Sequence, residues 1–312
     1  WPAEAGSKAL ERYVALEDAT VVERLKHAGA VLVGNTRMSE LGFGLAGDTT
    51  SRALSEGHAD CALVTDTLGE ARVAAATAGL WGFKPTYGIV SRFGLIGLVP
   101  SMESYSVIAA NAGVIAPVMQ VIAGRDERDF SMPDLAIPEF RLDGNGGDAI
   151  RHVAVLKESL ALLSPEDGKA FLPALSRLEK AGFSLREESM AEFDLFRTVH
   201  QVVGAVEASS SAGKYDGVRY GHRAASAKNW NEMYLKSRAE SFGLTVKAYL
   251  FQGAYFQFEN YDAFEDACRI RARLVKAMEN LLARVDAVAF PTQRKGHPAD
   301  KAETVSRIYE AF

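Results

Sequence analysis

The alternation of helical segments with short apolar runs constrains the fold of this chain more than any other feature. Residues Asp18–Ala28 form the first helical segment, in which Asp18 is a good N-cap because its carboxylate can accept a hydrogen bond from a first-turn amide. Its apolar side chains recur at helical spacing: Val21, Val22 and Leu25. Gly29 ends the helix, and Ala30–Gly34 follows as a short buried strand. This succession predicts an α/β layer fold.

The same alternation continues along the chain. Apolar runs predict strands over Cys61–Val64, Arg151–Leu156 and Val285–Thr292, and another strand beginning at Phe183 and Leu185. Helical periodicity predicts helices over Ser106–Ala123, Glu166–Ala181 and Tyr261–Arg284, the second with Phe171, Leu172, Leu175 and Leu178 facing inward. Loops are expected over Gly124–Pro138, with Arg125, Asp126, Arg128 and Asp129, and over Gly144–Gly147 and Gln293–Asp300. Ser209–Phe242 is polar and aromatic without clean periodicity.

Composition excludes several classes of protein. The chain has 312 residues, a net charge of −5 and 48% hydrophobic residues, which is an ordinary globular composition. This mild acidity argues against direct nucleic-acid binding, which favours a basic face. No apolar run reaches the ~18 residues of a membrane span, and the start at Trp1 has no signal-peptide pattern, although the missing Met suggests a fragment. The two cysteines indicate reduced thiols, so we expect a cytoplasmic protein.

Familiar catalytic and metal-binding motifs are absent from the sequence. It contains no CxxC pair, no HExxH, no GxSxG elbow and no P-loop. Its histidines are scattered, without the spacing of metal ligands: His27, His58, His152, His200, His222 and His297. We therefore predict neither a metal nor a cofactor.

The most suggestive local feature is the segment Asp66–Arg72, which follows an apolar strand and precedes an Ala-rich helix. Such a turn exposes backbone amides at a helix N-terminus, a geometry that suits an anion or a developing oxyanion. A strand-to-helix turn closed by acidic capping explains the same residues. The residues alone leave both interpretations open.

Several segments resemble the amidase-signature superfamily, in the family's order. These are Asp18–Leu25 with Gly29–Thr36, Gly82–Gly88 with Ser91–Gly94, and Val121–Asp126. The later part is similar to the A subunits of glutamyl-tRNA(Gln) amidotransferases: Tyr215–Arg223, Met233–Tyr234, Arg238, Phe242–Gly243 and Asp286–Thr292. The resemblance covers nearly the whole chain.

This resemblance implies one α/β/α domain over residues 1–312, with a large mixed central sheet covered by helices. It also implies a helical or irregular insertion at roughly 190–260 and truncation at both ends relative to the family. The family cleaves amides with a Ser–cis-Ser–Lys triad. In the A subunits the substrate is glutamine and the ammonia passes to a partner subunit, which implies a protein partner and a small amide or amino-acid ligand.

The chain departs from the family at the catalytic positions. The family's Asp-Thr-Gly-Gly-Ser motif corresponds to Asp66–Glu70, so Glu70 stands at the nucleophile and Leu68 at an oxyanion-hole glycine. Ala46 lies near the bridging serine, and the family's lysine would precede Trp1. We therefore predict no catalytic residue. The predicted ligand-binding residues are Asp66, Thr67, Gly69, Glu70 and Arg72.

These departures leave three hypotheses. The first is a catalytically degenerate relative, or pseudoenzyme, retained for binding. The second is an amide hydrolase or glutamine amidotransferase subunit that uses non-standard residues, such as Glu70 as a general base with a raised pKa. The third is a scaffold subunit of an amidotransferase-like assembly, suggested by the well-kept Tyr215–Arg223 stretch. Turnover assays and co-purification separate them.

Overall fold

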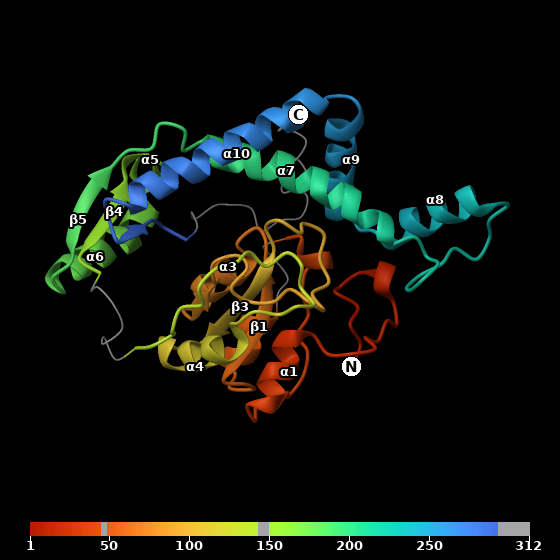
Figure 1. Cartoon of the computed structure of the whole chain (residues 1–312), viewed down its shortest axis with the longest axis horizontal. Helices are drawn as coiled ribbons and strands as arrows, with labels where there is room; N and C mark the ends of the chain where they lie inside the picture. Colours follow the sequence, from red (N-terminus) through yellow and green to blue (C-terminus); the bar gives the residue numbers. More distant parts are fainter. Residues whose placement is uncertain (45–48, 143–149, 293–312) are drawn as a thin grey trace.

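The fold is taken from a computed structural model of the chain, in which residues 1–44, 49–142 and 150–292 are described. The helices are α1 Thr20–His27, α2 Thr50–Ser55, α3 Glu70–Thr77, α4 Ala112–Ile122, α5 Lys157–Ala161, α6 Pro165–Lys180, α7 Leu195–Ser211, α8 Trp230–Ser241, α9 Leu244–Phe258 and α10 Tyr261–Leu282 (Figure 1). The strands are β1 Cys61–Asp66, β2 Trp81–Phe83, β3 Ser104–Ala109, β4 His152–Leu156, β5 Ser184–Glu188 and β6 Ala287–Ala289.

Six strands of the described residues form two sheets of three strands. The first has the order β1-β3-β2 and is antiparallel, with Cys61 opposite Ala109 and Asp66 opposite Ser104. The second has the order β5-β4-β6 and is parallel, with Val153 opposite Ala287. Parallel and antiparallel strands with helices packed on them confirm the predicted α/β class. The described strands form two small sheets, however, rather than the one large mixed sheet that we expected.

Each sheet is covered by helices. Helices α3 and α4 pack on the first sheet and α1 packs on α4, whereas α5 contacts β4 and α6 contacts β5 (Figure 1). The core between the first sheet, α1 and α4 contains fully buried aliphatic side chains: Val21, Val107, Met119 and Ile122. This core holds β1, and with it the turn that follows β1, in a fixed position.

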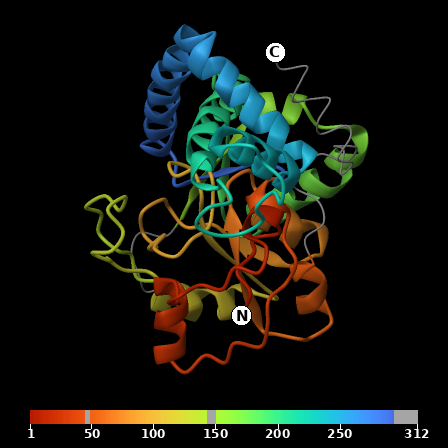
Figure 2. The same cartoon turned by 90° about the vertical axis from the view of Figure 1, so that its right-hand side faces the viewer.

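Three long helices, α7, α9 and α10, pack against one another beside the first sheet, as both views show (Figures 1 and 2). Gly253 of α9 permits the close approach to α7, because a Cβ atom there would lie 1.9 Å from the carbonyl oxygen of Ala205. Val246 and Tyr249 of α9 share a buried cluster with Leu98 and Val99 of the N-terminal half. The helices are thereby packed directly on the body that carries the turn after β1.

Two expectations for the N-terminal segment are wrong. Helix α1 begins at Thr20 with Ala19 as its N-cap, and Asp18 instead forms an ion pair with Lys26 at 2.5 Å. The segment Ala30–Gly34 is no strand: Val31 is 83% exposed and Val33 66% exposed. Among the described residues β1 pairs with β3 alone, so this segment has no neighbouring strand to bury it.

Other expectations need smaller corrections. The predicted helix Ser106–Ala123 is divided, because its first residues belong to β3 and Asn111 caps α4 through a bond from the N–H of Val114 at 3.2 Å. Leu172 of α6 is 52% exposed rather than inward. The stretch without periodicity contains α8, which begins at its N-cap Asn229. The loops expected at Gly144–Gly147 and Gln293–Asp300 both lie outside the described residues.

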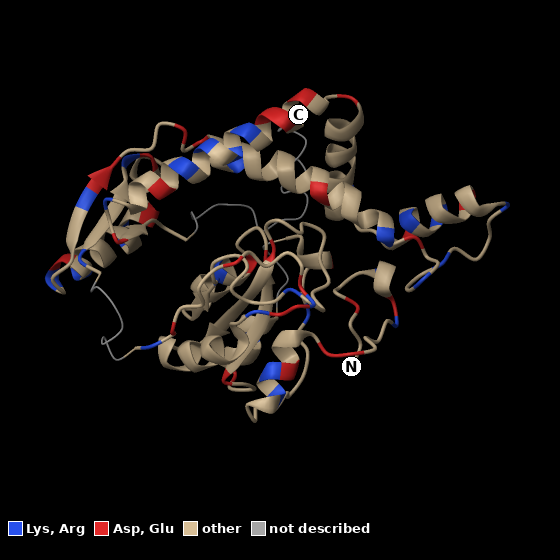
Figure 3. Ribbon diagram, viewed as in Figure 1, with Lys and Arg blue, Asp and Glu red and all other residues tan. Residues whose placement is uncertain are grey.

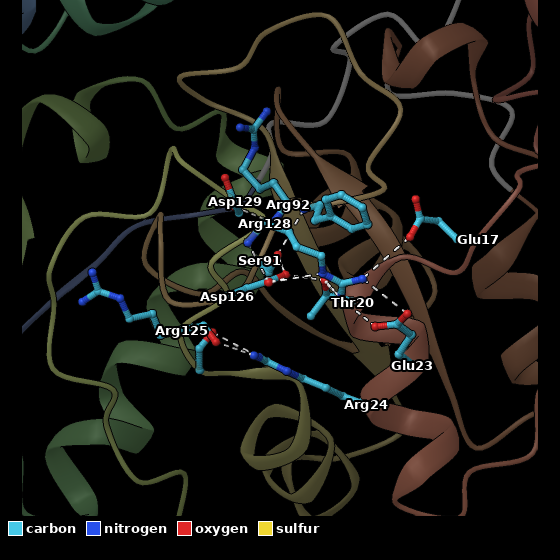
Figure 4. Close-up of polar contacts among 12 residues, drawn as sticks. Glu17, Thr20, Glu23, Arg24, Ser91, Arg92, Arg125, Asp126, Arg128 and Asp129 are labelled. Carbon is cyan, nitrogen blue, oxygen red and sulfur yellow. Dashed lines mark hydrogen bonds and ion pairs between the residues drawn. The ribbon is translucent and has the colours of Figure 1, made fainter.

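The charged loop after α4 has a structural role. The Asp126 carboxylate accepts hydrogen bonds from the hydroxyls of Thr20 and Ser91, and Arg128 donates to Glu23 at 2.6 Å (Figure 4). Arg24 donates to the carbonyl of Ile122 at 2.8 Å. These contacts tie α1 to the end of α4.

None of the helices described combines the length and the apolar character that a membrane-spanning helix needs.

Candidate functional site

The segment Asp66–Arg72 forms a tight turn between β1 and α3. Gly69 lies at the N-cap of α3 with φ of 103°, a left-handed conformation that side chains disfavour. This position explains why glycine follows Leu68: the chain must reverse direction within a few residues to enter α3. The turn therefore presents consecutive backbone amides at the start of a helix, as the sequence predicts.

An ion pair fixes the shape of the turn. Asp66 is fully buried, and its carboxylate accepts bonds from Nε of Arg72 at 2.9 Å and from Nη2 of Arg72 at 2.8 Å. The same carboxylate accepts the N–H of Gly69 at 3.0 Å. This bidentate geometry is the strong form of an arginine–carboxylate pair. Asp66 and Arg72 thus hold the two ends of the turn through a contact that does not involve Glu70.

Glu70 occupies the amides that the turn presents. Its Oε2 atom accepts the N–H of Thr67 and the N–H of Leu68, both at 2.7 Å. Its Oε1 atom is shielded from solvent and has no hydrogen-bond partner among the described residues. The sequence left open whether the turn binds an anion or is closed by acidic capping. The structure shows that a carboxylate of the chain itself caps the two amides.

Burial changes the titration of Glu70. Desolvation raises the pKa of the Glu70 carboxyl from 4.5 to about 7, even though the bonds from the Thr67 and Leu68 amides favour the charged form. Asp66 adds a smaller repulsion in the same direction as burial. The carboxyl group is therefore poised between its two protonation states near neutral pH.

Polar side chains from α7 and α9 lie against the turn. Nε2 of His200 is hydrogen-bonded to the Thr67 carbonyl at 3.0 Å, and burial lowers the pKa of this imidazole. The Tyr249 hydroxyl donates to Oε1 of Gln201 at 3.0 Å, and Gln201 in turn donates to the fully buried Gln252. Desolvation is the main cause that raises the pKa of Tyr249 to about 12, and the negative charge of Glu70 is the second. The two helices thus cover the turn with a buried polar chain.

A pocket of about 450 Å³ opens beside the turn. Its lining residues come from the turn, from α3, from β2 and the residue before it, and from the segment after β6: Leu68, Gly69, Arg72, Val73, Ala76, Leu80, Trp81, Gly82, Phe290 and Thr292. Most of these walls are apolar, and Arg72 supplies the one charged side chain among these lining residues. The pocket surface is therefore mixed, with only a modest excess of apolar over polar area.

The structure brings all five predicted ligand-binding residues together in one turn, but only Gly69 and Arg72 line the pocket. Ala46, predicted near the bridging serine, lies outside the described residues. The described residues contain no cluster of acidic, histidine or cysteine side chains suited to a metal. Sequence reasoning missed His200, Gln201, Tyr249 and Gln252, although a glutamine within each of two apolar helices was a usable signal.

Comparison with known proteins gives concordant matches. A family profile described as Amidase matches residues 1–53 and 50–309. The glutamyl-tRNA(Gln) amidotransferase A subunit of Symbiobacterium thermophilum is 33% identical over 92% of this chain, which spans 64% of that relative. The corresponding Ralstonia pickettii protein is 36% identical over 91% of this chain and 64% of its own length. This chain therefore spans slightly less than two thirds of these curated relatives.

Solved structures agree in fold. The crystal structure of the glutamyl-tRNA(Gln) amidotransferase A subunit from Thermotoga maritima superposes with a TM-score of 0.74 at 23% identity, over 99% of this chain and 69% of that one. A protein of a vestigial complex related to an s-triazine catabolic enzyme gives a TM-score of 0.77 at 22% identity, over 96% of this chain and 65% of that one. With the profile and the sequence relatives, these matches establish that the chain belongs to the amidase family.

Proposed function

We propose that this chain is a catalytically degenerate relative of the glutamyl-tRNA(Gln) amidotransferase A subunits, and that it acts by binding rather than by cleaving amides. The observation that carries the proposal is the position of Glu70. Its carboxylate accepts both the Thr67 and the Leu68 amides at 2.7 Å, in the turn that corresponds by resemblance to the family's nucleophile motif.

The electrostatics of this turn oppose amide hydrolysis. Attack on an amide develops negative charge on the carbonyl oxygen, and oxyanion-hole donors stabilise that charge. Here two such donors already bind a carboxylate, and Leu68 adds a side chain where the family motif has glycine. Glu70 would also place a like charge beside the developing oxyanion. Loss of a catalytic unit of this kind lowers rates by several orders of magnitude.

The binding role is assigned to the pocket beside the turn and to the protein surface. The apolar walls around Trp81 and Phe290, with Arg72 at the edge, suit a small amide or amino-acid ligand. The relatives are named as subunits of an amidotransferase, which supports a protein partner for this chain as well. In this proposal Asp66, Thr67 and Glu70 shape the site, and Gly69 and Arg72 contact the ligand.

Ammonia release from glutamine and from a panel of small amides tests the proposal, with native protein and a Glu70→Ser variant assayed side by side. We expect no turnover by the native protein. Absence of activity in both proteins supports the binding role, and so does activity gained by Glu70→Ser alone. Activity of the native protein would overturn the proposal, and its loss in the variant would make Glu70 the catalytic residue.

A second candidate function rests on the same side chain. The raised pKa of Glu70, about 7, is a property of a general base, and its Oε1 atom has no hydrogen-bond partner among the described residues. An amide hydrolase of this kind would lose its activity in Glu70→Gln, which keeps the shape and removes the proton acceptor. Its rate would also rise with pH through about 7, as the carboxyl group ionises.

A further inference from the structure

Helix α9 carries apolar side chains on all of its faces, yet one face is exposed. Its 15 residues include a single charged side chain, Lys247, and the ribbon of α9 is almost free of charge beside the strongly charged α10 (Figure 3). The buried side of α9 packs on α7 and α10 through Val246, Tyr249 and Phe256. A helix that is apolar all round is normally covered on every side.

The exposed residues of α9 form one stripe. They are Leu244, 63% exposed, Phe251, 70%, Tyr255, 40%, and Phe258, 80%. Positions 244, 251 and 258 are seven residues apart and position 255 follows 251 by four, so all four side chains share one side of the helix. Apolar residues at this heptad spacing form the seam by which one helix packs against another. The stripe is therefore suited to packing against another helix.

The charges at the two ends of the stripe suit a second copy of the same helix. Lys247 lies in the first turn of α9, whereas Glu259 and Asp262 lie at the other end, where the chain enters α10. In an antiparallel pair, the cationic end of one helix lies alongside the acidic end of its partner. The two helix dipoles are then antiparallel, which is also favourable. Lys247 donates to the Ala239 carbonyl at 2.6 Å and keeps further N–H donors for a partner.

We propose that two copies of this chain associate through the α9 stripe, with their α9 helices antiparallel. The interface is isologous, because each copy contributes the same four side chains to the other. Phe251 lies near the centre of the stripe and is the expected anchor, since large central aromatic residues dominate such interfaces. This association is independent of Glu70 and of the presence or absence of amidase activity.

The oligomeric state of purified protein tests this inference, measured by light scattering after size exclusion and by sedimentation over a range of concentrations. Native protein is expected to dimerise, and Phe251→Lys is expected to raise the dimer Kd by at least about thirty-fold. Leu235→Lys is the matched control: Leu235 of α8 is 71% exposed but lies off the stripe, so this variant should dimerise like native protein.

Phe258→Lys serves as a second variant of the stripe, and circular dichroism verifies that each variant is folded. Monomeric native protein at high concentration would overturn the inference, as would a dimer that survives both Phe251→Lys and Phe258→Lys. Loss of the dimer in Leu235→Lys would also contradict it, because the interface would then include α8.

Discussion

Glu70→Gln tests whether burial or amide bonding dominates the energetics of the turn. The side chains have the same shape, and the glutamine carbonyl can still accept the Thr67 and Leu68 amides. Burial raises the pKa of the native carboxyl from 4.5 to about 7, so the folded state holds its proton more tightly than the unfolded state. Native stability must therefore fall as pH rises between these two values, and the glutamine variant lacks this loss.

The size of the effect follows from the two pKa values. A rise from 4.5 to about 7 corresponds to about 3 kcal/mol in full, of which about 2.5 kcal/mol develops between pH 5 and pH 8. Urea unfolding of native protein and Glu70→Gln across this range measures the difference at each pH. Between pH 5 and pH 8, we expect the free energy of unfolding of the variant to rise by about 2.5 kcal/mol relative to that of native protein.

The control is Glu127→Gln, which removes a carboxylate that is exposed in the loop after α4 rather than buried in the turn. A flat difference for Glu70→Gln would refute the reasoning. So would native protein that gains stability relative to the variant as pH rises, because the amide bonds would then outweigh the desolvation of Glu70.

Three further substitutions test the turn, the contact between α7 and α9, and the loop after α4. Asp66→Asn should cost about 2–3 kcal/mol in urea unfolding, because it leaves Arg72 without its buried carboxylate. Gly253→Ala should cost about 2 kcal/mol or more in thermal unfolding, since its Cβ would lie 1.9 Å from the Ala205 carbonyl, whereas Gly213→Ala, with no atom within 4 Å, should be nearly neutral. Asp126→Asn should lower the free energy of unfolding at neutral pH. Burial acts to raise the pKa of Asp126, but the hydrogen bonds from Thr20, Arg128 and Ser91 outweigh it and lower this pKa. The stability difference between native protein and the variant should therefore shrink as pH falls below 3.8.

The sequence predicted most elements whose signals are local. The strand predicted over Cys61–Val64, the Ala-rich helix after the turn and the helix predicted over Tyr261–Arg284 were found because their signals lie within the segments themselves. The predicted strand Ala30–Gly34 failed because an apolar run specifies a strand only if a neighbouring strand is available. The division of Ser106–Ala123 was missed because strand and helix both tolerate a short apolar run.

The turn of the candidate site was predictable, but neither its internal arrangement nor the side chains that cover it could be predicted. The residues Asp66–Arg72 could be singled out because a turn between a strand and a helix exposes amides. That Glu70 folds back onto the amides of Thr67 and Leu68 depends on side-chain torsions that no sequence pattern specifies. The contacts of His200 and Gln252 depend on the packing of α7 and α9, which lie far along the chain.

The division of the described strands into two small sheets has a consequence for how the molecule opens. In each sheet only the middle strand, β3 or β4, has neighbours on both sides. Amide hydrogens of these two strands should exchange with solvent most slowly, while those at the short outer strands β2 and β6 exchange through local fraying. We therefore expect resistance to local opening to be greatest in Ser104–Ala109 and His152–Leu156.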